Sequence, residues 1–208
     1  MKYIIIFIIG YFMGTISSSY LVGKFAGNID IRKYGSGNLG ATNTMRVLGL
    51  KAGVGVLLAD FLKGMIATLI GIWIGGRFGG LIGGLGAILG HNWPIFLAFK
   101  GGKGIATSLG LIFTLFPAIG FILVAIGIII IIITRYVSLA SLTGSVIFPI
   151  LVALFNHDPI YIVIRLHGPT YIVMSILISA LAIYRHRSNI ERLIKGNENK
   201  ISFHTRSR

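Results

Sequence analysis

The sequence predicts an all-α polytopic membrane protein with about seven transmembrane helices, its N-terminus outside and its C-terminus cytoplasmic. Hydrophobic residues make up 55% of the 208 positions and charged residues only 12%, about half the roughly 25% charged residues of a soluble domain. Apolar stretches long enough to span a bilayer recur along the chain, and Lys and Arg gather between alternate stretches. This composition excludes a water-soluble single domain and a disordered chain.

Apolar runs predict the individual spans, because a helix that crosses a hydrocarbon core of about 30 Å needs roughly 20 apolar residues. Such runs lie at Tyr3–Val22, Ala52–Ile74, Gly80–Ala98, Tyr136–Phe155 and Pro169–Tyr184. The first is interpreted as an uncleaved signal anchor rather than a cleaved signal peptide, since the basic stretch that follows it resists export.

The remaining apolar run, residues 105–133, contains 29 almost uninterrupted apolar residues. As one helix it would be about 43 Å long, too long for a single crossing. Pro117 lies near its middle, and proline disfavours helix continuation. We therefore expect two short helices, broken at Phe116–Pro117. Alternatively, residues 105–133 form a re-entrant segment that enters and leaves the membrane on one side, together with five full spans. That arrangement places the same loops inside and outside.

Charge distribution supports seven spans. In that arrangement fifteen Lys and Arg lie inside, Lys2, Arg77 and Arg165 lie outside, and Lys63 lies within a span. Treating residues 105–133 as a single crossing divides the charges eight against ten, without the inward bias that membrane proteins show. The chain, residues 1–208, is treated as one domain, with a rather long outer segment at Asn156–Gly168. Its net charge of +14 also suits the binding of anions.

Polar residues gather in three segments, 34–46, 90–108 and 184–198, all expected on the cytoplasmic side. The first contains the pattern G-x-G-x-x-G, but a dinucleotide site needs a βαβ unit that a chain of membrane spans does not supply. Its glycines still let successive backbone N–H groups turn toward an anion. Hydroxyl and amide donors accompany them, together with one arginine that can bind phosphate through two hydrogen bonds: Ser36, Asn38, Thr42, Asn43 and Arg46. The alternative is a polar turn that caps a short helix.

The second segment places Lys100 and Lys103 on either side of the pair Gly101-Gly102. Two lysines can neutralise a phosphate while the bare backbone approaches it closely. Gly104 stands where the P-loop pattern needs Ser or Thr, so that pattern is not met. The alternative is that both lysines only anchor the inner end of a span.

The third segment carries a histidine among basic residues. If this segment is helical, His186 and Asn189 lie on one face and can serve one substrate. His186 is a candidate base or hydrogen-bond donor, because histidine titrates near physiological pH. The alternative is a basic juxtamembrane segment that touches anionic lipid head groups.

Four polar residues outside these segments are further candidates. Ser138 and Ser141 stand at the inner end of a span and either line the same pocket or satisfy helix backbone. Asp60 and Lys63 are three residues apart within a span. We interpret them as a structural ion pair, although charges within the membrane are also functional candidates.

The residue inventory restricts the chemistry. Five Asp and Glu and no Cys provide no carboxylate cluster or thiolate for a metal, so no metal and no cofactor are expected. The nucleophile-elbow pattern G-x-S-x-G is absent. Anion-binding groups at one interface can meet a soluble phosphate and a membrane-borne acyl chain, which predicts acyl or phospholipid chemistry with direct transfer.

Two other classes of protein remain as alternatives. A transporter of an organic phosphate places polar groups near the bilayer midplane, often in repeated halves, and the sequence has no clear internal repeat. A structural membrane subunit whose basic loops bind a partner would not need glycine loops with paired lysines.

The three segments closely resemble the signature motifs of the bacterial acyl-phosphate:glycerol-3-phosphate acyltransferases, the PlsY type. The first motif corresponds to Ser36-Gly37-Asn38-Leu39-Gly40-Ala41-Thr42-Asn43 with Arg46. The second corresponds to Gly90-His91, Pro94, Phe96-Leu97 and Phe99-Lys100-Gly101-Gly102-Lys103-Gly104-Ile105-Ala106-Thr107. The third corresponds to Arg185-His186, Asn189-Ile190, Arg192-Leu193, Gly196 and Glu198.

This resemblance implies a multi-pass protein of the bacterial inner membrane, with its active site facing the cytoplasm. The 1-hydroxyl of glycerol 3-phosphate would attack an acyl phosphate, giving lysophosphatidate and phosphate in the first step of phospholipid biosynthesis. The acyl phosphate would come from an upstream enzyme. Because this donor is already an activated anhydride, no covalent enzyme intermediate is required. The H-x-x-x-x-D motif of other glycerol phosphate acyltransferases is absent, and His186 with Glu191 is its nearest approach.

The resemblance also implies roles for single residues. The expected catalytic residues are Ser36, Arg46, Lys103, His186 and Asn189. The expected substrate-binding residues are Gly37, Asn38, Thr42, Asn43, Lys100, Gly101, Gly102, Gly104, Ser138, Ser141 and Arg185. Glu198 is expected to hold the architecture. Membrane lipids are the other expected partners, with no nucleic acid. The base that takes the hydroxyl proton, His186 or an oxygen of the acyl phosphate, remains open.

Overall fold

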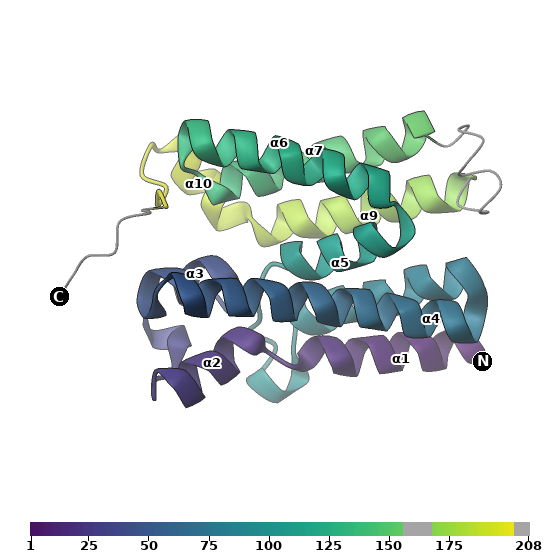
Figure 1. The fold of residues 1–208 in the computed structure, drawn as a ribbon, viewed down its shortest axis with the longest axis horizontal. Coiled ribbons are helices and arrows are strands. Elements are labelled where there is room, and N and C mark those ends of the chain that lie inside the picture. Colours follow the sequence, from purple (N-terminus) through teal and green to yellow (C-terminus); the bar gives the residue numbers. More distant parts are fainter. Residues whose placement is uncertain (156–167, 202–208) are drawn as a thin grey trace. The chain divides into compact units, whose positions relative to one another are not determined.

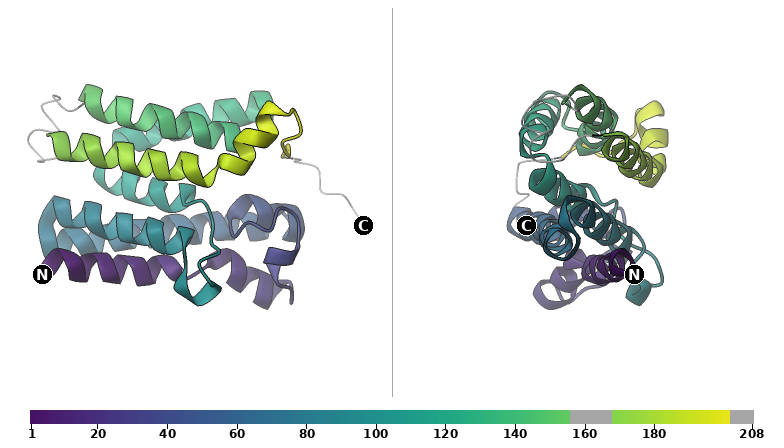
Figure 2. Two further views of the ribbon diagram at one scale, coloured as in Figure 1. Left: turned by 180° about the vertical axis from the view of Figure 1, so that it is seen from behind. Right: turned by 90° about the vertical axis from the view of Figure 1, so that its right-hand side faces the viewer.

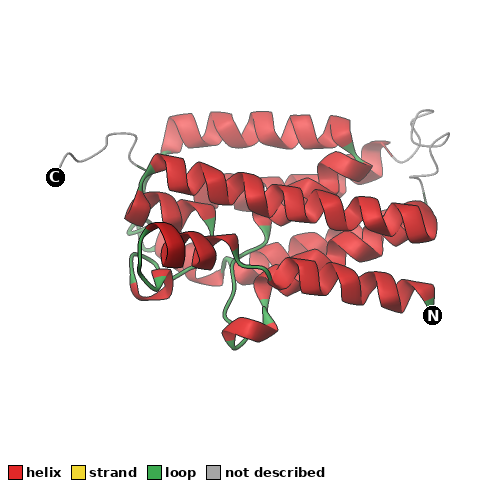
Figure 3. Cartoon of the chain, turned by 60° about the horizontal axis from the view of Figure 1, so that its bottom comes forward, coloured by secondary structure: helices red, strands yellow, loops and turns green. Residues whose placement is uncertain are grey.

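The computed structural model describes residues 1–155 and 168–201. Every regular element in these ranges is a helix, without a strand among them (Figure 3), which confirms the all-α fold. The chain forms two compact units, here called the N-terminal unit (described residues 1–114) and the C-terminal unit (described residues 115–155 and 168–201). The long outer segment expected at Asn156–Gly168 lies, except for Gly168, outside the described residues.

Several helices are long and apolar enough to cross a membrane. By length and composition the described residues contain four such helical stretches, Lys2–Ala26, Leu50–Leu97, Pro117–Thr134 and Val137–Phe155. Two shorter apolar helices, Ile105–Leu115 and Pro169–Arg185, accompany them. The seven spans and the orientation of the termini stay predictions.

The N-terminal unit begins with two helices where the sequence predicts one. Helix α1 (Lys2–Thr15) ends before Ile16, and α2 (Ser18–Ala26) begins after Ser17. Ile16 and Ser17 are extended, and the Ser17 side chain caps α2 by accepting from the backbone N–H of Tyr20. The single helix predicted over Tyr3–Val22 is therefore interrupted, because a serine side chain satisfies the new helix terminus.

Helix α4 (Leu50–Asn92) contains the next two predicted spans as two arms, side by side in Figure 2. Gly76 separates them with a non-helical backbone, φ 68° and ψ −165°, a conformation open to glycine and rarely to other residues. The second arm ends at Asn92 instead of Ala98. Pro94 follows closely, and the residue before a proline disfavours the helical conformation.

Small residues bring the arms of α4 and helix α1 into backbone contact. Within α4, Gly71 packs on Gly79. Between the helices, Gly10 packs on Gly83, and a Cβ atom at Gly10 would collide with the Gly83 carbonyl oxygen. Helices approach this closely in membranes where small residues line both surfaces. Figure 1 shows α1 running along α4.

Substitution of Gly10 by Val should therefore destabilise the N-terminal unit. The added methyl groups meet backbone that cannot rotate away, and overpacking of this kind costs about 1–3 kcal/mol. Thermal unfolding in detergent measures the loss. Gly55→Val is the matched control, because no atom lies within 4 Å of a Cβ placed at Gly55. Equal unfolding temperatures for the two variants would contradict the assigned contact.

The predicted break near Phe116 is confirmed. Helix α5 (Ile105–Leu115) ends before Phe116, and α6 (Pro117–Thr134) begins with proline in its first turn. Proline lacks the backbone N–H that a helix interior uses, but the first turn does not need that donor.

The C-terminal unit continues with α7 (Val137–Phe155), α9 (Pro169–Arg185) and α10 (Arg187–Ile194). The ring of Phe116 packs edge-on against Phe148 and Tyr171, with centroids 6.2 and 6.0 Å apart. His186, with φ −95° and ψ 7°, separates α9 from α10. The helix is therefore interrupted at His186, which caps α10, and the service of His186 and Asn189 to one substrate stays a prediction.

Candidate active site

The first polar segment is ordered by one buried amide. Asn43, in α3 (Ala41–Leu48), accepts two hydrogen bonds at Oδ1, from the backbone N–H of Ser36 at 2.8 Å and from its hydroxyl at 3.2 Å. Its Nδ2 donates to the carbonyl of Tyr34 at 3.1 Å. Gly35 and Gly37 have φ of 60° and 67°, so the loop depends on glycine at both turns. Asn43 thus fixes the loop, and direct contact between Asn43 and substrate stays a prediction.

Helix α3 is itself anchored below this loop. The Thr44 hydroxyl lies 2.7 Å from that of Ser19 in α2, and both side chains are buried. Arg46 follows in the last turn of α3 on the exposed side, and Ser36 is exposed as well. The segment therefore presents a hydroxyl and a guanidinium from a rigid base, while Asn38 and Thr42 are partly exposed.

The guanidinium of Arg32, close to this segment in sequence, is held by an ion pair. Arg32 forms a two-pronged ion pair with Asp30 at distances of 2.7 to 3.2 Å and lies over the ring of Tyr20. The hydrogen bond from Arg32 lowers the pKa of the Asp30 carboxyl to about 2. Arg32 is thus committed to this pair, and anion binding by Arg46 stays a prediction.

The second polar segment meets the first at Gly102. The backbone N–H of Gly102 donates to the carbonyl of His91 at 3.1 Å. A Cβ atom at Gly102 would collide with the imidazole of His91 and with the carbonyl oxygen of Leu39. No side chain fits there, so the glycine required by the pattern serves a tight crossing between two chain segments. Lys103 follows, half-buried, and Lys100 is exposed.

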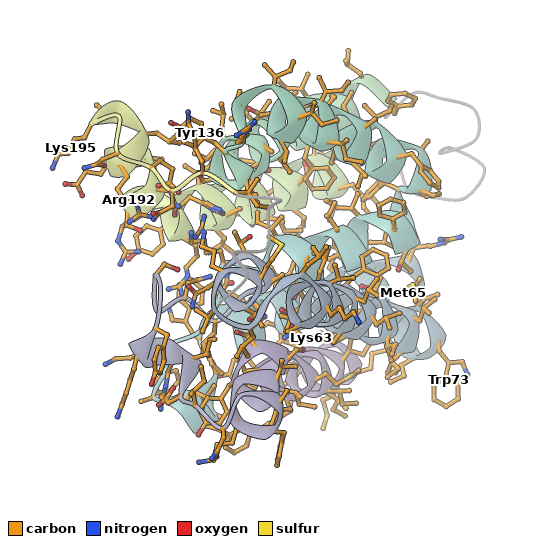
Figure 4. All side chains as sticks on the ribbon, turned by 60° about the vertical axis from the view of Figure 1, so that its left-hand side comes forward. Lys63, Met65, Trp73, Tyr136, Arg192 and Lys195 are labelled. Atoms are coloured by element: carbon orange, nitrogen blue, oxygen red, sulfur yellow. The ribbon has the colours of Figure 1, made fainter. Side chains whose placement is uncertain are left out.

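The predicted ion pair inside α4 is confirmed, with Lys63 Nζ 2.7 Å from Asp60 Oδ1. It belongs to a larger group, because Lys63 Nζ also lies 2.9 Å from Nδ1 of His91. Figure 4 shows Lys63 directed inward among the helices of the N-terminal unit, whereas Trp73 projects outward. The spacing within α4 indicated the pair, but nothing in the sequence indicated the histidine 28 residues later.

The third polar segment is organised around Glu198. Its carboxylate accepts from Asn189 Nδ2 and from Arg192 Nε, each at 2.8 Å. These bonds tie the segment after α10 back to Arg192 in that helix, and Figure 4 shows Lys195, just after the helix end, pointing outward. The Asn189 amide is thereby oriented by Glu198.

The imidazole of His186 has a defined protonation at one nitrogen. Its Nδ1 lies 2.8 Å from the carbonyl oxygen of Ala182. Because a carbonyl only accepts, Nδ1 carries the proton, and in the neutral ring Nε2 holds the lone pair. A role for His186 as base or hydrogen-bond donor stays a prediction.

The two serines of α7 have different surroundings. The Ser141 hydroxyl donates to the carbonyl of Val137 at 2.9 Å, which matches the alternative that it satisfies helix backbone. Ser138 is buried. Its hydroxyl is one of the smaller causes that lower the pKa of the Glu198 carboxyl. Arg185 lies half-buried at the end of α9, next to His186.

The stability of this segment should depend on pH through Glu198. Burial by itself raises the pKa of the Glu198 carboxyl, but the hydrogen bonds from Asn189 and Arg192 outweigh it, so the pKa lies below the ordinary 4.5. A lowered carboxyl pKa stabilises the fold above pH 4.5, and this stabilisation is lost as the pH falls below that value. The unfolding temperatures of the protein and of Glu198→Gln should therefore differ at pH 7 and converge under acid. A difference that did not change with pH would contradict the assignment.

The predicted site residues thus fall into two groups. Segments 34–46 and 90–108 come together in the N-terminal unit, while the third segment and both serines of α7 belong to the C-terminal unit. In residues 1–155 and 168–201, no three Asp, Glu or His side chains gather as metal ligands. The two groups consist of hydroxyls, amides, glycine backbone and cations.

Known proteins resemble the chain over nearly its whole length. The glycerol-3-phosphate acyltransferase family matches residues 4–196. A glycerol-3-phosphate acyltransferase from Thermoanaerobacter sp. (strain X514) is 48% identical over 195 residues, which are 93% of each chain. One from Fusobacterium nucleatum is 44% identical over 208 residues, 98% of this chain and all of the relative.

A solved structure supports the same relationship. The crystal structure of PlsY (YgiH), an integral membrane glycerol 3-phosphate acyltransferase, in its glycerol 3-phosphate form superposes with a TM-score of 0.86 and 37% identity. The match covers 97% of this chain and 96% of that one. The lysophosphatidic acid form of PlsY gives a TM-score of 0.83. The chain belongs to the glycerol-3-phosphate acyltransferase family.

Proposed function

We propose that this protein transfers an acyl group from acyl phosphate to the 1-hydroxyl of glycerol 3-phosphate, at the cytoplasmic face of the bacterial inner membrane. The products are 1-acylglycerol 3-phosphate and inorganic phosphate, and the reaction opens phospholipid biosynthesis. An upstream enzyme supplies the acyl phosphate.

One observation carries this proposal. The solved PlsY structures that match the chain at 37% identity bear the names of a glycerol 3-phosphate form and a lysophosphatidic acid form. These two compounds are the acceptor and the product of the proposed transfer. Identity at this level over nearly the whole chain supports the same acceptor here.

The choice of acyl phosphate as donor rests on the residues themselves. The chain has no H-x-x-x-x-D motif of the kind found in other glycerol phosphate acyltransferases. It offers instead several anion-binding groups, Ser36, Arg46 and Lys103 among them, for two phosphate-bearing substrates. Cations offset the repulsion between these substrates and hold them in reacting orientation.

In the proposed reaction the acceptor's hydroxyl oxygen forms a bond to the acyl carbonyl carbon, and the bond from that carbon to the phosphate oxygen breaks. Phosphate leaves with the electron pair. The hydroxyl proton passes to Nε2 of His186 or to a phosphate oxygen of the donor. Asn189, oriented by Glu198, is proposed to position the acceptor, and Ser36 with Arg46 and Lys103 to bind the phosphates.

A donor comparison tests this proposal. Purified protein in detergent is supplied with glycerol 3-phosphate and palmitoyl phosphate, palmitoyl-CoA or palmitoyl carrier protein, one at a time. We expect lysophosphatidate from palmitoyl phosphate alone. Product from either thioester but not from the acyl phosphate would overturn the proposed donor.

Direct transfer is tested without the acceptor. Protein incubated with radiolabelled palmitoyl phosphate and then denatured should retain no label, because no acyl-enzyme forms. Label that stays on the protein and moves to added glycerol 3-phosphate would contradict direct transfer.

A further inference from the structure

A buried polar network lies in the N-terminal unit, and the proposed reaction makes no use of it. It consists of Ser18, Asp60, Lys63 and His91, and the last three are each less than one-tenth exposed. The Ser18 hydroxyl donates to Asp60 Oδ1 at 2.9 Å. Charges within the membrane are costly and are retained mostly where they serve a site.

Lys63 is fully occupied as a donor. Its ammonium lies 2.7 Å from Asp60 Oδ1, 2.9 Å from the carbonyl oxygen of Ile16 and 2.9 Å from Nδ1 of His91. An ammonium has three N–H donors and no acceptor, so these contacts use all of them. The Ile16 carbonyl is accessible because the chain is extended between α1 and α2.

The network fixes a proton on Nε2 of His91. If Lys63 is an ammonium, Nδ1 of His91 accepts from it, and the neutral ring carries its proton on Nε2. If the proton has instead passed from Lys63 to the imidazole, both ring nitrogens are protonated. Because the buried Asp60 carboxylate needs one cation beside it, either Lys63 or His91, Nε2 is a donor in both states.

That donor faces the crossing of the two polar segments. A Cβ atom at Gly102 would contact both Nε2 of His91 and the carbonyl oxygen of Leu39. The imidazole of His91, the backbone of Leu39 and the backbone of Gly102 therefore lie close together. The carbonyl of His91 also accepts from the backbone N–H of Gly102. His91 therefore touches the glycine loop at two points, through its backbone carbonyl and through its imidazole, immediately before Lys103.

We infer that Asp60 and Lys63 act as positioning residues. Through His91, they hold the Gly101–Gly104 loop against the first polar segment in the geometry that binds the phosphate of glycerol 3-phosphate. This inference rests on the proposed function. Asp60 orients Lys63, Lys63 fixes the protonation and orientation of His91, and His91 fixes the loop.

Two substitutions of His91 separate the ends of the ring. Asn at position 91 keeps an acceptor near Nδ1 for Lys63 but does not reach the loop. Gln can place an N–H near the position of Nε2. We expect His91→Asn to raise the KM for glycerol 3-phosphate about tenfold, the scale of one hydrogen bond, with kcat within about threefold. His91→Gln should lie closer to the unmodified protein. Equal KM values in the two variants would overturn the inference.

A double-mutant cycle tests the action of the ion pair through His91. The double substitution Asp60→Asn with Lys63→Met removes both charges together and leaves no unpaired ion. We expect it to raise the KM about tenfold in the natural background and less than about twofold in the His91→Gln background, because coupled residues are not additive. An equal effect in both backgrounds would show a merely structural role. Lys51→Met, an exposed lysine of the same helix, is the matched control, and thermal unfolding confirms that each variant folds.

A second readout separates this inference from the proposed donor. Stabilisation of the protein by glycerol 3-phosphate alone, measured as a shift in unfolding temperature, needs no acyl donor. If palmitoyl phosphate is not a substrate but the shift is lost in His91→Asn and kept in His91→Gln, the proposed donor fails and the inference stands. A shift that is the same in both variants would refute the inference whatever the donor.

Discussion

Replacement of Gly102 by Ala should lower kcat/KM for glycerol 3-phosphate about 100-fold, the scale of an ångström-sized misplacement in an active site. The new Cβ atom would overlap the His91 imidazole and the Leu39 carbonyl oxygen, so the loop that carries Lys103 must move. Steady-state kinetics with palmitoyl phosphate measures the loss.

Gly55→Ala is the control for this experiment, because a Cβ atom at Gly55 meets no neighbour within 4 Å. It should leave kcat/KM unchanged and support normal insertion into the membrane. Full activity in Gly102→Ala would mean that the two polar segments do not meet as described.

Loss of the Arg46 guanidinium should be comparably severe. Hydrogen bonds to a charged group contribute about 1.5–3 kcal/mol, so Arg46→Ala is expected to lower kcat/KM roughly 100-fold. Arg46→Lys keeps the charge but cannot form two parallel hydrogen bonds to phosphate, so it should recover only part of the activity. Kinetics at varied glycerol 3-phosphate measures both variants.

Lys51→Ala controls for the removal of a cation close by, since Lys51 is exposed at the start of the next helix. Its kinetics should match those of the unmodified protein. If Arg46→Lys were fully active, a point charge would suffice at this position and the two-bonded contact would be refuted.

Local sequence signals predicted most of the helical architecture. Composition and the length of apolar runs predicted the helices, and Pro117 predicted the break that separates α5 from α6. These features depend on backbone geometry and solvation, which residue type controls directly. The interruption of the first helix at Ile16 was not predicted, because its stabilisation includes the bond from Lys63 to the Ile16 carbonyl, a tertiary contact.

The candidate site was predicted as a set of residue types but not as a set of contacts. Asn43 was expected among the substrate-binding residues, which stays a prediction, but its ordering of the loop around Ser36 was not predicted. His91 lies 28 positions from Lys63, so no helical period relates them. Spacing finds partners within one helix, as it did for Asp60 and Lys63, while contacts between helices depend on packing that periodicity does not encode.

The same distinction applies to the third segment. His186 and Asn189 were expected on one helix face, but the backbone leaves the helix at His186. The bond from Asn189 to Glu198 spans nine residues and depends on the fold of the chain after α10. The motif therefore identified the residues that come together, and the structure supplied their geometry.

Product stoichiometry in lipid vesicles tests the central claim most directly. Purified protein in sealed vesicles is given labelled glycerol 3-phosphate and palmitoyl phosphate, and lysophosphatidate, phosphate and labelled glycerol 3-phosphate inside the vesicles are all measured. Acyl transfer predicts lysophosphatidate and phosphate in a one-to-one ratio, formed only when both substrates are present. Labelled glycerol 3-phosphate that accumulated unmodified inside the vesicles, with no lysophosphatidate formed, would contradict the enzyme and identify a transporter.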